Sequence, residues 1–278
     1  YPEVDNTIKI GVMNPITGPL EPDAYGFWWG ADQAISDLND MYPDLDFELI
    51  EVDSGCDGNM ASSAAYDLVE EGVVAVVGAA CSGASMGANA VLSAYGIPMI
   101  SYASTNPGLS DDEDYPLFYR VVPSDAIQGP AGADMIAYDV MMNDSLAILH
   151  MDNSYGTGLA DSVKEAWEEV GYGFCGAGMQ SYAEDTTDFS WLVDPIVADD
   201  TCEAVYLASY VTDAAGIIEE LHDQGYTGEI YAGDGAAGID LYNYMTDNSL
   251  LEGVTVTAPR AGFSYGDFEE RYDANADD

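Results

Sequence analysis

The feature that most constrains the fold is a regular alternation of short apolar runs with amphipathic stretches of helical period. In the first half of the chain, the apolar runs are residues 8–13, 47–53, 73–79 and 97–103. The stretches between them that carry apolar side chains at helical spacing are residues 26–38, 59–70 and 84–95. Such runs predict strands and such stretches predict helices. This order indicates a parallel sheet with helices on both faces.

The same rhythm restarts after residues 118–125. The strands expected in the second half are residues 145–151, 171–179, 203–209 and 229–234. The helices expected there are residues 128–141, 158–170, 188–198 and 213–224. A last strand, at residues 252–259, is followed by about one helix's worth of chain.

We therefore predict an α/β fold of two doubly wound parallel-sheet lobes joined by a hinge. The predicted division is 1–121 for the first lobe, 122–252 for the second and 253–278 for a crossover that returns to the first. The alternative for the last segment is a chain truncated at its C-terminus. A length of 278 residues suits two domains, and 48% apolar residues suffice for two cores.

Charge excludes several classes of partner. The chain has 51 Asp and Glu against 5 Lys and Arg, a net charge of −46. Such a surface repels phosphate backbones and anionic headgroups, so nucleic acid and membrane surfaces are not expected partners. The acids are scattered through every segment, which is typical of a protein adapted to molar salt, where the Debye length is about 3 Å. Cation storage is the alternative, but no calcium-loop pattern occurs, and residues 111–115 lack its spacing.

The four cysteines favour an exported protein. None forms C-x-x-C and the chain has two histidines, so neither a structural zinc site nor any other metal or cofactor is predicted. One close pair in each half, Cys56 with Cys81 and Cys175 with Cys202, suits two local disulfides. The alternative is four unrelated buried thiols. The chain shows neither a signal peptide nor a run of 18 apolar residues, and it begins like a processed one, so any anchor would lie upstream.

Ligands of open α/β sheets bind at the carboxyl ends of strands, so the turns there are the candidate sites. The turn after the third strand, "GAACSGAS", offers the Ser82 hydroxyl and free backbone N–H groups for a carboxylate, and its small residues would let a ligand approach. The next turn, "SYASTNPGL", offers the backbone of Ala103 and the hydroxyl of Thr105. Helix capping is the alternative role for these residues. The turn after the third strand has no lysine in the P-loop position, and no G-x-G-x-x-G fingerprint follows the first strand.

A serine hydrolase is a less favoured alternative. Residues 83–87, "GASMG", match G-x-S-x-G, with Ser85 as nucleophile and His150 or His222 as base. A nucleophile elbow places the serine at the strand-to-helix corner, whereas Ser85 falls inside the expected helix. Cys81 is a second candidate nucleophile, unless it forms a disulfide.

Three residues of the second lobe also follow expected strands. Tyr155 and Tyr210 lie at two such turns, where a single tyrosine is more often a packing residue. Asp234 follows an apolar strand and lies between two glycines, which leaves it accessible from a cleft. A carboxylate there could pair with an ammonium group.

Together these segments resemble the type I periplasmic-binding-protein family, and within it the branched-chain amino-acid-binding proteins of ABC transporters. The matching landmarks, spread over residues 7–260, are "IKIGVMNPITGPL", "GADQAISDLN", "VDSGCD", "VVGAACSGAS", "IPMISYASTNPGL", "VVPSDAIQGPAGA", "HMDNSYGTGLADSV", "AVYLASY" and "YAGDG". The resemblance implies capture of an amino acid between two hinged lobes and its delivery to a membrane permease.

The resemblance also implies residue roles. The contacts to the ligand's α-carboxylate and α-amino groups fall on Ser82, Ala103 and Thr105, and the second-lobe partners on Tyr155, Tyr210 and Asp234. The family usually has Glu in place of Asp234. Its cysteine pair falls on Cys56 and Cys81; the pairing of Cys175 with Cys202 has no such match. An aromatic lid residue falls on Tyr25, with Trp28 as the next choice. Relatives continue well beyond the equivalent of Asp278.

The sequence therefore predicts a monomeric, non-enzymatic solute-binding protein outside the membrane, extracellular, anchored at the cell surface or periplasmic, from an organism of high salt. Its partners would be a small amino acid or amide and a permease. The rival from another class is the ligand-binding sensor domain of a receptor, which shares the fold.

Overall fold

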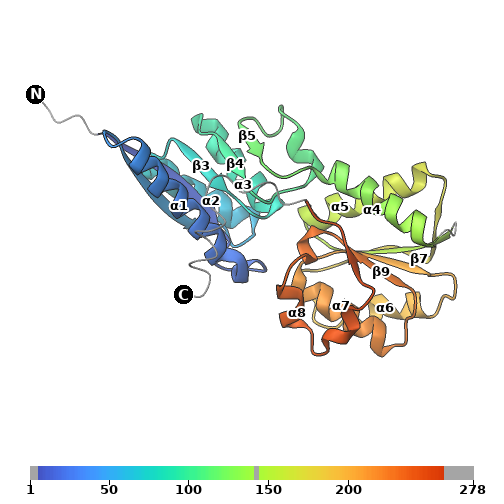
Figure 1. Ribbon diagram of the computed structural model, residues 1–278. Helices are drawn as coiled ribbons and strands as arrows, with labels where there is room; N and C mark the ends of the chain where they lie inside the picture. The colour runs from blue at the N-terminus through green and yellow to red at the C-terminus, as the bar shows by residue number, and fades with distance from the viewer. Residues whose placement is uncertain (1–5, 141–143, 260–278) are drawn as a thin grey trace, which may run out of the picture.

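The computed structural model describes residues 6–140 and 144–259, and it consists of two α/β lobes side by side (Figure 1). Each lobe is built on a five-stranded sheet in which every strand pair is parallel. The predicted fold class is confirmed. The helices within these residues include none that is both long and apolar enough to cross a membrane.

The first sheet has the strand order β2-β1-β3-β4-β5. Its strands are β1 (Thr7–Asn14), β2 (Asp46–Asp53), β3 (Ala75–Gly78), β4 (Met99–Ser101) and β5 (Phe118–Arg120). Its helices are α1 (Ala24–Met41), α2 (Gly58–Glu71) and α3 (Ser82–Leu92), with short 3-10 turns η1 (Glu21–Asp23), η2 (Ser93–Tyr95) and η3 (Pro107–Ser110).

The second sheet has the order β10-β9-β8-β6-β7. Its strands are β6 (Asp144–Met151), β7 (Gly173–Tyr182), β8 (Ala204–Ala208), β9 (Glu229–Ala232) and β10 (Thr255–Val256). Its helices are α4 (Asp125–Val140), α5 (Ser154–Glu169), α6 (Ser190–Val197), α7 (Val211–Asp223) and α8 (Asp240–Tyr244), with 3-10 turns η4 (Asp234–Ala236) and η5 (Asn248–Leu251). Figure 1 shows α4 and α5 on one face and α6, α7 and α8 on the other.

Burial on both faces explains the apolar runs of the sequence. All five residues of β8 are buried, because helices cover the second sheet on both sides. A strand in that position gains nothing from alternating polar residues, so its sequence is continuously apolar.

Glycines set how closely the helices of the first lobe approach. The ideal Cβ of an alanine at Gly87 would overlap the carbonyl oxygen of Gly58, the first residue of α2. A Cβ at Gly58 would in turn lie 3.0 Å from the carbonyl oxygen of Gly83. Part of the small-residue run at residues 78–87 therefore serves helix packing, a role that we did not predict for it.

Both disulfides are present. Cys56 pairs with Cys81 and Cys175 with Cys202, each with a Cα–Cα distance of 5.1 Å. The predicted pairing is confirmed, and the alternative of four separate thiols is wrong. Among the described residues, Cys175, Asp199 and Cys202 bring possible metal-ligand atoms together. The disulfide occupies both of those sulfurs, so this group offers a metal no thiolate.

The last predicted strand lies in a different place from the one expected. Thr255 and Val256 pair with Tyr231 and Ala232 of β9, so the second sheet extends into the segment 253–278 that we expected to cross back to the first lobe. Residues 260–278 of that segment lie outside the described residues, as does residue 141 at the end of a predicted helix. Strand β5 was missed, because three residues are too short for a visible apolar run.

Candidate ligand-binding site

A cavity of about 220 Å³ lies between the two lobes, at the carboxyl ends of strands from both sheets. Its first-lobe lining is Leu20, Asp23, Phe27, Ala80, Ser82 and Ala103. Its second-lobe lining is Tyr155, Tyr210, Val211, Asp234, Gly235, Ala237 and Asp240. Strands β1 and β6 each pair with strands on both sides that follow them in sequence, so each sheet has a switch point where crossovers run to opposite sides. Open α/β sheets bind ligands at such points.

Ser82 presents a hydroxyl at the start of α3. The side chain is 1% exposed, and its Oγ accepts a hydrogen bond from the backbone N of Asn106 at 3.2 Å. That bond uses a lone pair of the oxygen and leaves the O–H free to donate. The first backbone N–H groups of a helix lack intrahelical partners, so Ser82 adds a hydroxyl to a place that already favours an anion.

Ala103 and Thr105 follow β4 beside Ser82. The N–H of Ala103 donates to the Ser101 Oγ at 3.2 Å, so the backbone group that Ala103 can offer a ligand is its carbonyl oxygen. Thr105 is 1% exposed and does not line the cavity, and its carbonyl oxygen accepts a hydrogen bond from the N of Asp125 at 2.9 Å. Thr105 therefore lies behind the cavity wall, against the start of α4.

The second-lobe wall is organised by Tyr155 and Asp234. Asn153 caps α5 by accepting a hydrogen bond from the Gly156 N at 2.8 Å, and this fixes Tyr155 in the first turn of the helix. The Tyr155 hydroxyl donates to Asp234 Oδ1 at 2.8 Å and accepts from the Gly235 N at 2.8 Å. A side chain at Gly235 would collide with this hydroxyl. The glycine that follows Asp234 thus makes room for its tyrosine partner.

Tyr210 completes the same wall from the start of α7. Its ring stacks on that of Tyr155, with centroids 5.0 Å apart and an interplanar angle of 12°. Both rings are buried, at 4% exposure for Tyr155 and 5% for Tyr210. Burial, followed by the charges of nearby carboxylates, raises the pKa of both phenols, so each remains protonated and can only donate its hydrogen or accept as a neutral group.

The carboxylate of Asp234 is held by hydrogen-bond donors, and no basic side chain among the described residues lines its cavity. Gln128 Nε2 donates to Asp234 Oδ1 at 3.1 Å and also to Thr257 O at 3.1 Å. Burial raises the pKa of Asp234, while the hydrogen bonds from Tyr155 and Gln128 lower it. The lining includes no Lys, Arg or His from the described residues. The wall is thus suited to a positive group, which none of the described residues supplies.

A second buried carboxylate lies behind the first. Asp125, the first residue of α4, is 0% exposed, and burial followed by the charge of Asp234 raises its pKa to about 7. Thr105 and the Arg120 guanidinium lower it, but by less. Arg120 Nη1 is engaged with two carbonyl oxygens, those of Asn106 at 2.9 Å and Ser104 at 3.3 Å.

Most of the predicted site residues line this one cavity. Ser82, Ala103, Tyr155, Tyr210 and Asp234 all line the cavity, and Thr105 lies just behind it. Tyr25 does not line it.

Phe27 lines the cavity instead of Tyr25, which is 63% exposed and packs against Trp28 with ring centroids 6.0 Å apart. Two residues along a helix turn the side chain by about 200°, so Tyr25 and Phe27 lie on opposite faces of α1. In this structure Phe27 is therefore the aromatic residue of α1 that meets the cavity, and the lid role of Tyr25 stays a prediction.

Sequence reasoning also missed Gln128, Asp23 and Asp240. Gln128 lies in the predicted second-lobe helix at residues 128–141, where nothing distinguished it from a surface residue. Asp23 and Asp240 are two acids among 51. No local pattern could mark them, because their position at the cavity depends on how the two lobes meet.

The residues of the hydrolase alternative have structural roles. Ser85 is buried, and its hydroxyl lies 2.8 Å from the Ser104 Oγ and 3.2 Å from the Ala79 carbonyl oxygen. His150 Nδ1 lies 3.0 Å from the Met151 carbonyl oxygen, and His222 Nε2 lies 3.1 Å from that of Leu250. Cys81 is in a disulfide. These contacts give no support to a nucleophile at Ser85 or Cys81.

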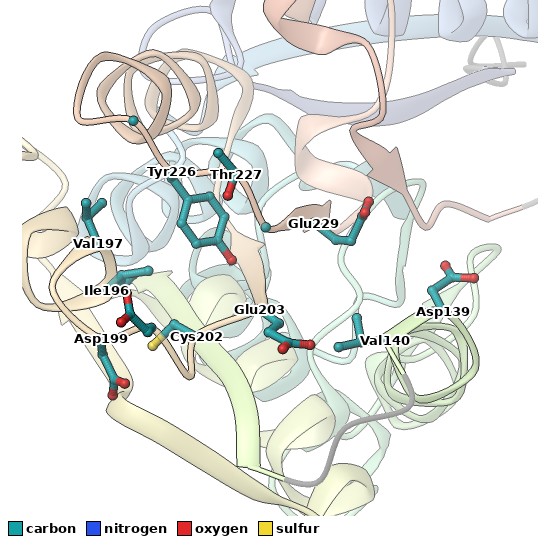
Figure 2. A pocket seen from close by; sticks show the side chains of 13 residues that line it. Asp139, Val140, Ile196, Val197, Asp199, Cys202, Glu203, Tyr226, Thr227 and Glu229 are labelled. Carbon is teal, nitrogen blue, oxygen red and sulfur yellow. The ribbon is translucent and has the colours of Figure 1, made fainter.

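A larger cavity, of about 520 Å³, opens at the other end of the second sheet (Figure 2). Glu203 and Glu229, which line it, stand at the amino ends of β8 and β9, and Asp139 and Asp199 lie on opposite sides of it. All of its lining comes from the second lobe. Because the strands present their amino ends there and one lobe supplies every wall, hinge motion would not close it, and we take the interlobe cavity as the ligand site.

Comparison with known proteins gives the same architecture. The Leu/Ile/Val/Thr-binding protein of Salmonella typhimurium is 29% identical over 255 residues, which are 91% of this chain and 68% of the relative. The branched-chain amino acid transporter substrate binding protein LivJ from Streptococcus pneumoniae, solved in complex with isoleucine, is 26% identical with a TM-score of 0.74, covering 86% of this chain and 68% of that one.

The leucine binding protein LivK from Thermotoga maritima has a TM-score of 0.82 at 24% identity, covering 97% of this chain and 75% of that one, and so agrees in fold. A sequence profile described as periplasmic binding protein matches residues 7–277. Because this match spans nearly the whole chain, the protein belongs to the periplasmic binding protein family.

Proposed function

We propose that this protein is the extracellular solute-binding protein of an ABC transporter and captures a small amino acid between its lobes. The proposal rests on one cavity whose two walls differ in chemistry. The first lobe offers the Ser82 hydroxyl and a helix N-terminus for a carboxylate, and the second offers Asp234 for an ammonium group. The names of the relatives, which refer to binding of leucine, isoleucine, valine and threonine, support the same ligand class.

This arrangement explains how binding would close the hinge. The two charged ends of an amino acid are recognised from opposite lobes, so the full set of contacts exists only when the lobes are together. A ligand with such differential contacts shifts the equilibrium from open to closed forms. Closure removes water and so strengthens the few charge-assisted hydrogen bonds that hold the ligand.

Individual residues receive roles on this basis. Ser82 donates its O–H to the α-carboxylate, while the Ala103 carbonyl oxygen and Asp234 accept from the α-ammonium. Tyr155 and Gln128 hold the Asp234 carboxylate in place through their hydrogen bonds. Thr105 supports the first-lobe wall from behind. Tyr210 and Phe27 supply apolar surface to the cavity.

The proposal extends to partners and surroundings. The protein would act as a monomer and deliver its ligand to a membrane permease, outside the membrane, either anchored at the cell surface or periplasmic. The net charge of −46 supports an origin in high salt. The two disulfides support an oxidising compartment.

Replacing Asp234 tests the function. Asp234→Asn keeps the shape but removes the charge that pairs with the ammonium, and hydrogen bonds to charged groups contribute about 1.5–3 kcal/mol. We expect the affinity for the bound amino acid to fall at least tenfold, measured by isothermal titration calorimetry in molar salt.

Asp112→Asn, which removes an exposed acid of the first lobe, is the matched control and should bind like the wild type. Equal affinities of the Asp234 variant and the wild type would remove Asp234 from the site. Thermal-shift screening of a panel of amino acids and small amides would identify the compound to titrate.

A further inference from the structure

Two carboxylates besides Asp234 line the interlobe cavity, and they come from opposite lobes. Asp23 is the last residue of η1 in the first lobe, and Asp240 is the first residue of α8 in the second. Both side chains are partly buried and line the same cavity, and the charge of Asp240 acts on Asp23. The two carboxyl groups therefore stand at the junction of the two lobes.

No basic side chain among the described residues balances this pair. The cavity lining contains three carboxylates and no Lys, Arg or His within residues 6–140 and 144–259. Lys9 forms a salt bridge with Glu71 at 2.8 Å, and Arg120 is engaged with backbone carbonyl oxygens behind Thr105. Burial, followed by the charge of Asp240, raises the pKa of Asp23. Two neighbouring carboxylates that are partly out of water repel each other. They share a proton, which the raised pKa of Asp23 favours, unless a positive group between them relieves the repulsion.

The place of the pair in the cavity indicates which part of a ligand meets it. The α-carboxylate and α-ammonium of an amino acid are assigned to Ser82, Ala103 and Asp234. The lining that remains includes two carboxylates, Asp23 and Asp240, and apolar residues such as Leu20, Phe27, Val211 and Ala237. A side chain that extends from Asp234 to this remaining wall would pass apolar surface and end between two carboxylates. A branched-chain side chain would bring neither a charge nor a hydrogen-bond donor to these two carboxylates.

We propose that the cavity selects an amino acid whose side chain ends in a cation, an ammonium or a guanidinium, held between Asp23 and Asp240. This inference rests on the proposed function and narrows its ligand class. The side-chain cation links the two lobes in the same way as the α-carboxylate and α-ammonium do. It therefore adds to the contacts that exist only in the closed form.

The test compares two amino acids whose side chains have the same number of heavy atoms. L-ornithine ends in an ammonium group where L-norleucine ends in a methyl group. In calorimetric titrations at constant molar salt and pH 8, we expect L-ornithine to bind the wild type at least tenfold more tightly than L-norleucine. Partly buried charges are screened by salt less than exposed ones, so the preference persists at high salt.

Variants from each lobe locate the effect. Asp240→Asn and, independently, Asp23→Asn should each weaken L-ornithine at least tenfold and change L-norleucine by less than threefold. Asp112→Asn is the control and should alter neither affinity. Two variants in different lobes keep the test decisive if one of them fails to fold.

The inference is overturned if L-norleucine binds the wild type as tightly as L-ornithine, or if both variants leave the ratio of the two affinities unchanged. These outcomes differ from failure of the proposed function. If an uncharged amino acid binds tightly and Asp234→Asn weakens it, the function stands and the cationic preference is wrong. If no amino acid binds, both are wrong.

Discussion

Lowering the salt concentration from 2 M to 0.1 M is expected to unfold this protein at room temperature. Its 51 acidic residues face 5 basic ones. In 1 M salt the Debye length is about 3 Å, whereas in 0.1 M salt it is about 10 Å, so neighbouring acids begin to repel one another. Folding brings these charges closer than they are in the unfolded chain. Since domains are stable by only about 5–15 kcal/mol, repulsion among 46 net charges is expected to exceed that margin.

Circular dichroism of samples dialysed to NaCl concentrations between 0.1 M and 3 M measures this effect. The folded signal and the melting temperature should rise together with salt. Sucrose at the same osmolality in 0.1 M NaCl is the control, because it favours compact states without screening charge. A melting temperature that is the same in 0.1 M and 2 M NaCl would contradict the proposed adaptation to high salt.

The second large effect concerns Asp125 and pH. This carboxyl group is fully buried, and its pKa in the folded state is raised to about 7, from an ordinary value of 3.8. Between these two pH values the folded state binds the proton more tightly than the unfolded chain does. The contribution of Asp125 to the free energy of unfolding therefore falls as pH rises from about 4 to about 7.

Asp125→Asn removes this dependence. We expect the variant to gain about 3 kcal/mol in free energy of unfolding relative to the wild type when the pH changes from 5 to 8. The dipole of α4, whose first residue is Asp125, favours the ionised form and makes this an upper figure. Urea titrations of both proteins at the two pH values, in constant molar salt, measure it.

The double difference cancels the titration of every group that does not interact with Asp125. Asp234, whose charge contributes to the shift, stays coupled to Asp125, and the measured difference includes that coupling. Asp112→Asn, an exposed acid, should show no comparable difference. A stability difference between wild type and Asp125→Asn that is equal at pH 5 and pH 8 would mean that the carboxyl of Asp125 titrates normally in the folded state.

The fold could be predicted because local patterns of apolar residues specify its strands and helices. The period of apolar residues changes from strand to helix along the chain, and burial on both faces of a parallel sheet makes runs such as β8 continuously apolar. The strands that were misjudged are short ones, such as β5 with three residues. In so short a segment, pairing with neighbouring strands determines whether a strand forms, and the apolar pattern is too short to show it.

The candidate site could be predicted where it lies in turns between strands and helices. Ser82, Tyr155 and Asp234 each follow an apolar run, so their place at a strand's carboxyl end follows from the sequence. Asp23 and Asp240 could not be found in this way. They are far apart in the sequence, they resemble the other acids, and only the approach of the two lobes brings them together.

Phe27 and the glycines near α3 also have roles that depend on how separate segments pack together. Which face of α1 meets the cavity depends on where that helix starts, and a change of two residues reverses the face. The small residues at 78–87 appeared to serve only a ligand, yet Gly87 is needed where α2 crosses α3. Helix packing distances are set by contacts that a single segment does not show.

The central claim is that the interlobe cavity binds an amino acid by both of its charged ends. The measurement that tests it most directly is a calorimetric titration, in molar salt, with the tightest-binding L-amino acid of a screened panel and with the same compound lacking its α-ammonium group. We predict saturable binding of one amino acid per protein and at least a tenfold loss of affinity without the ammonium. Equal affinity for the two compounds, or saturable binding by no amino acid of the panel, would contradict the claim.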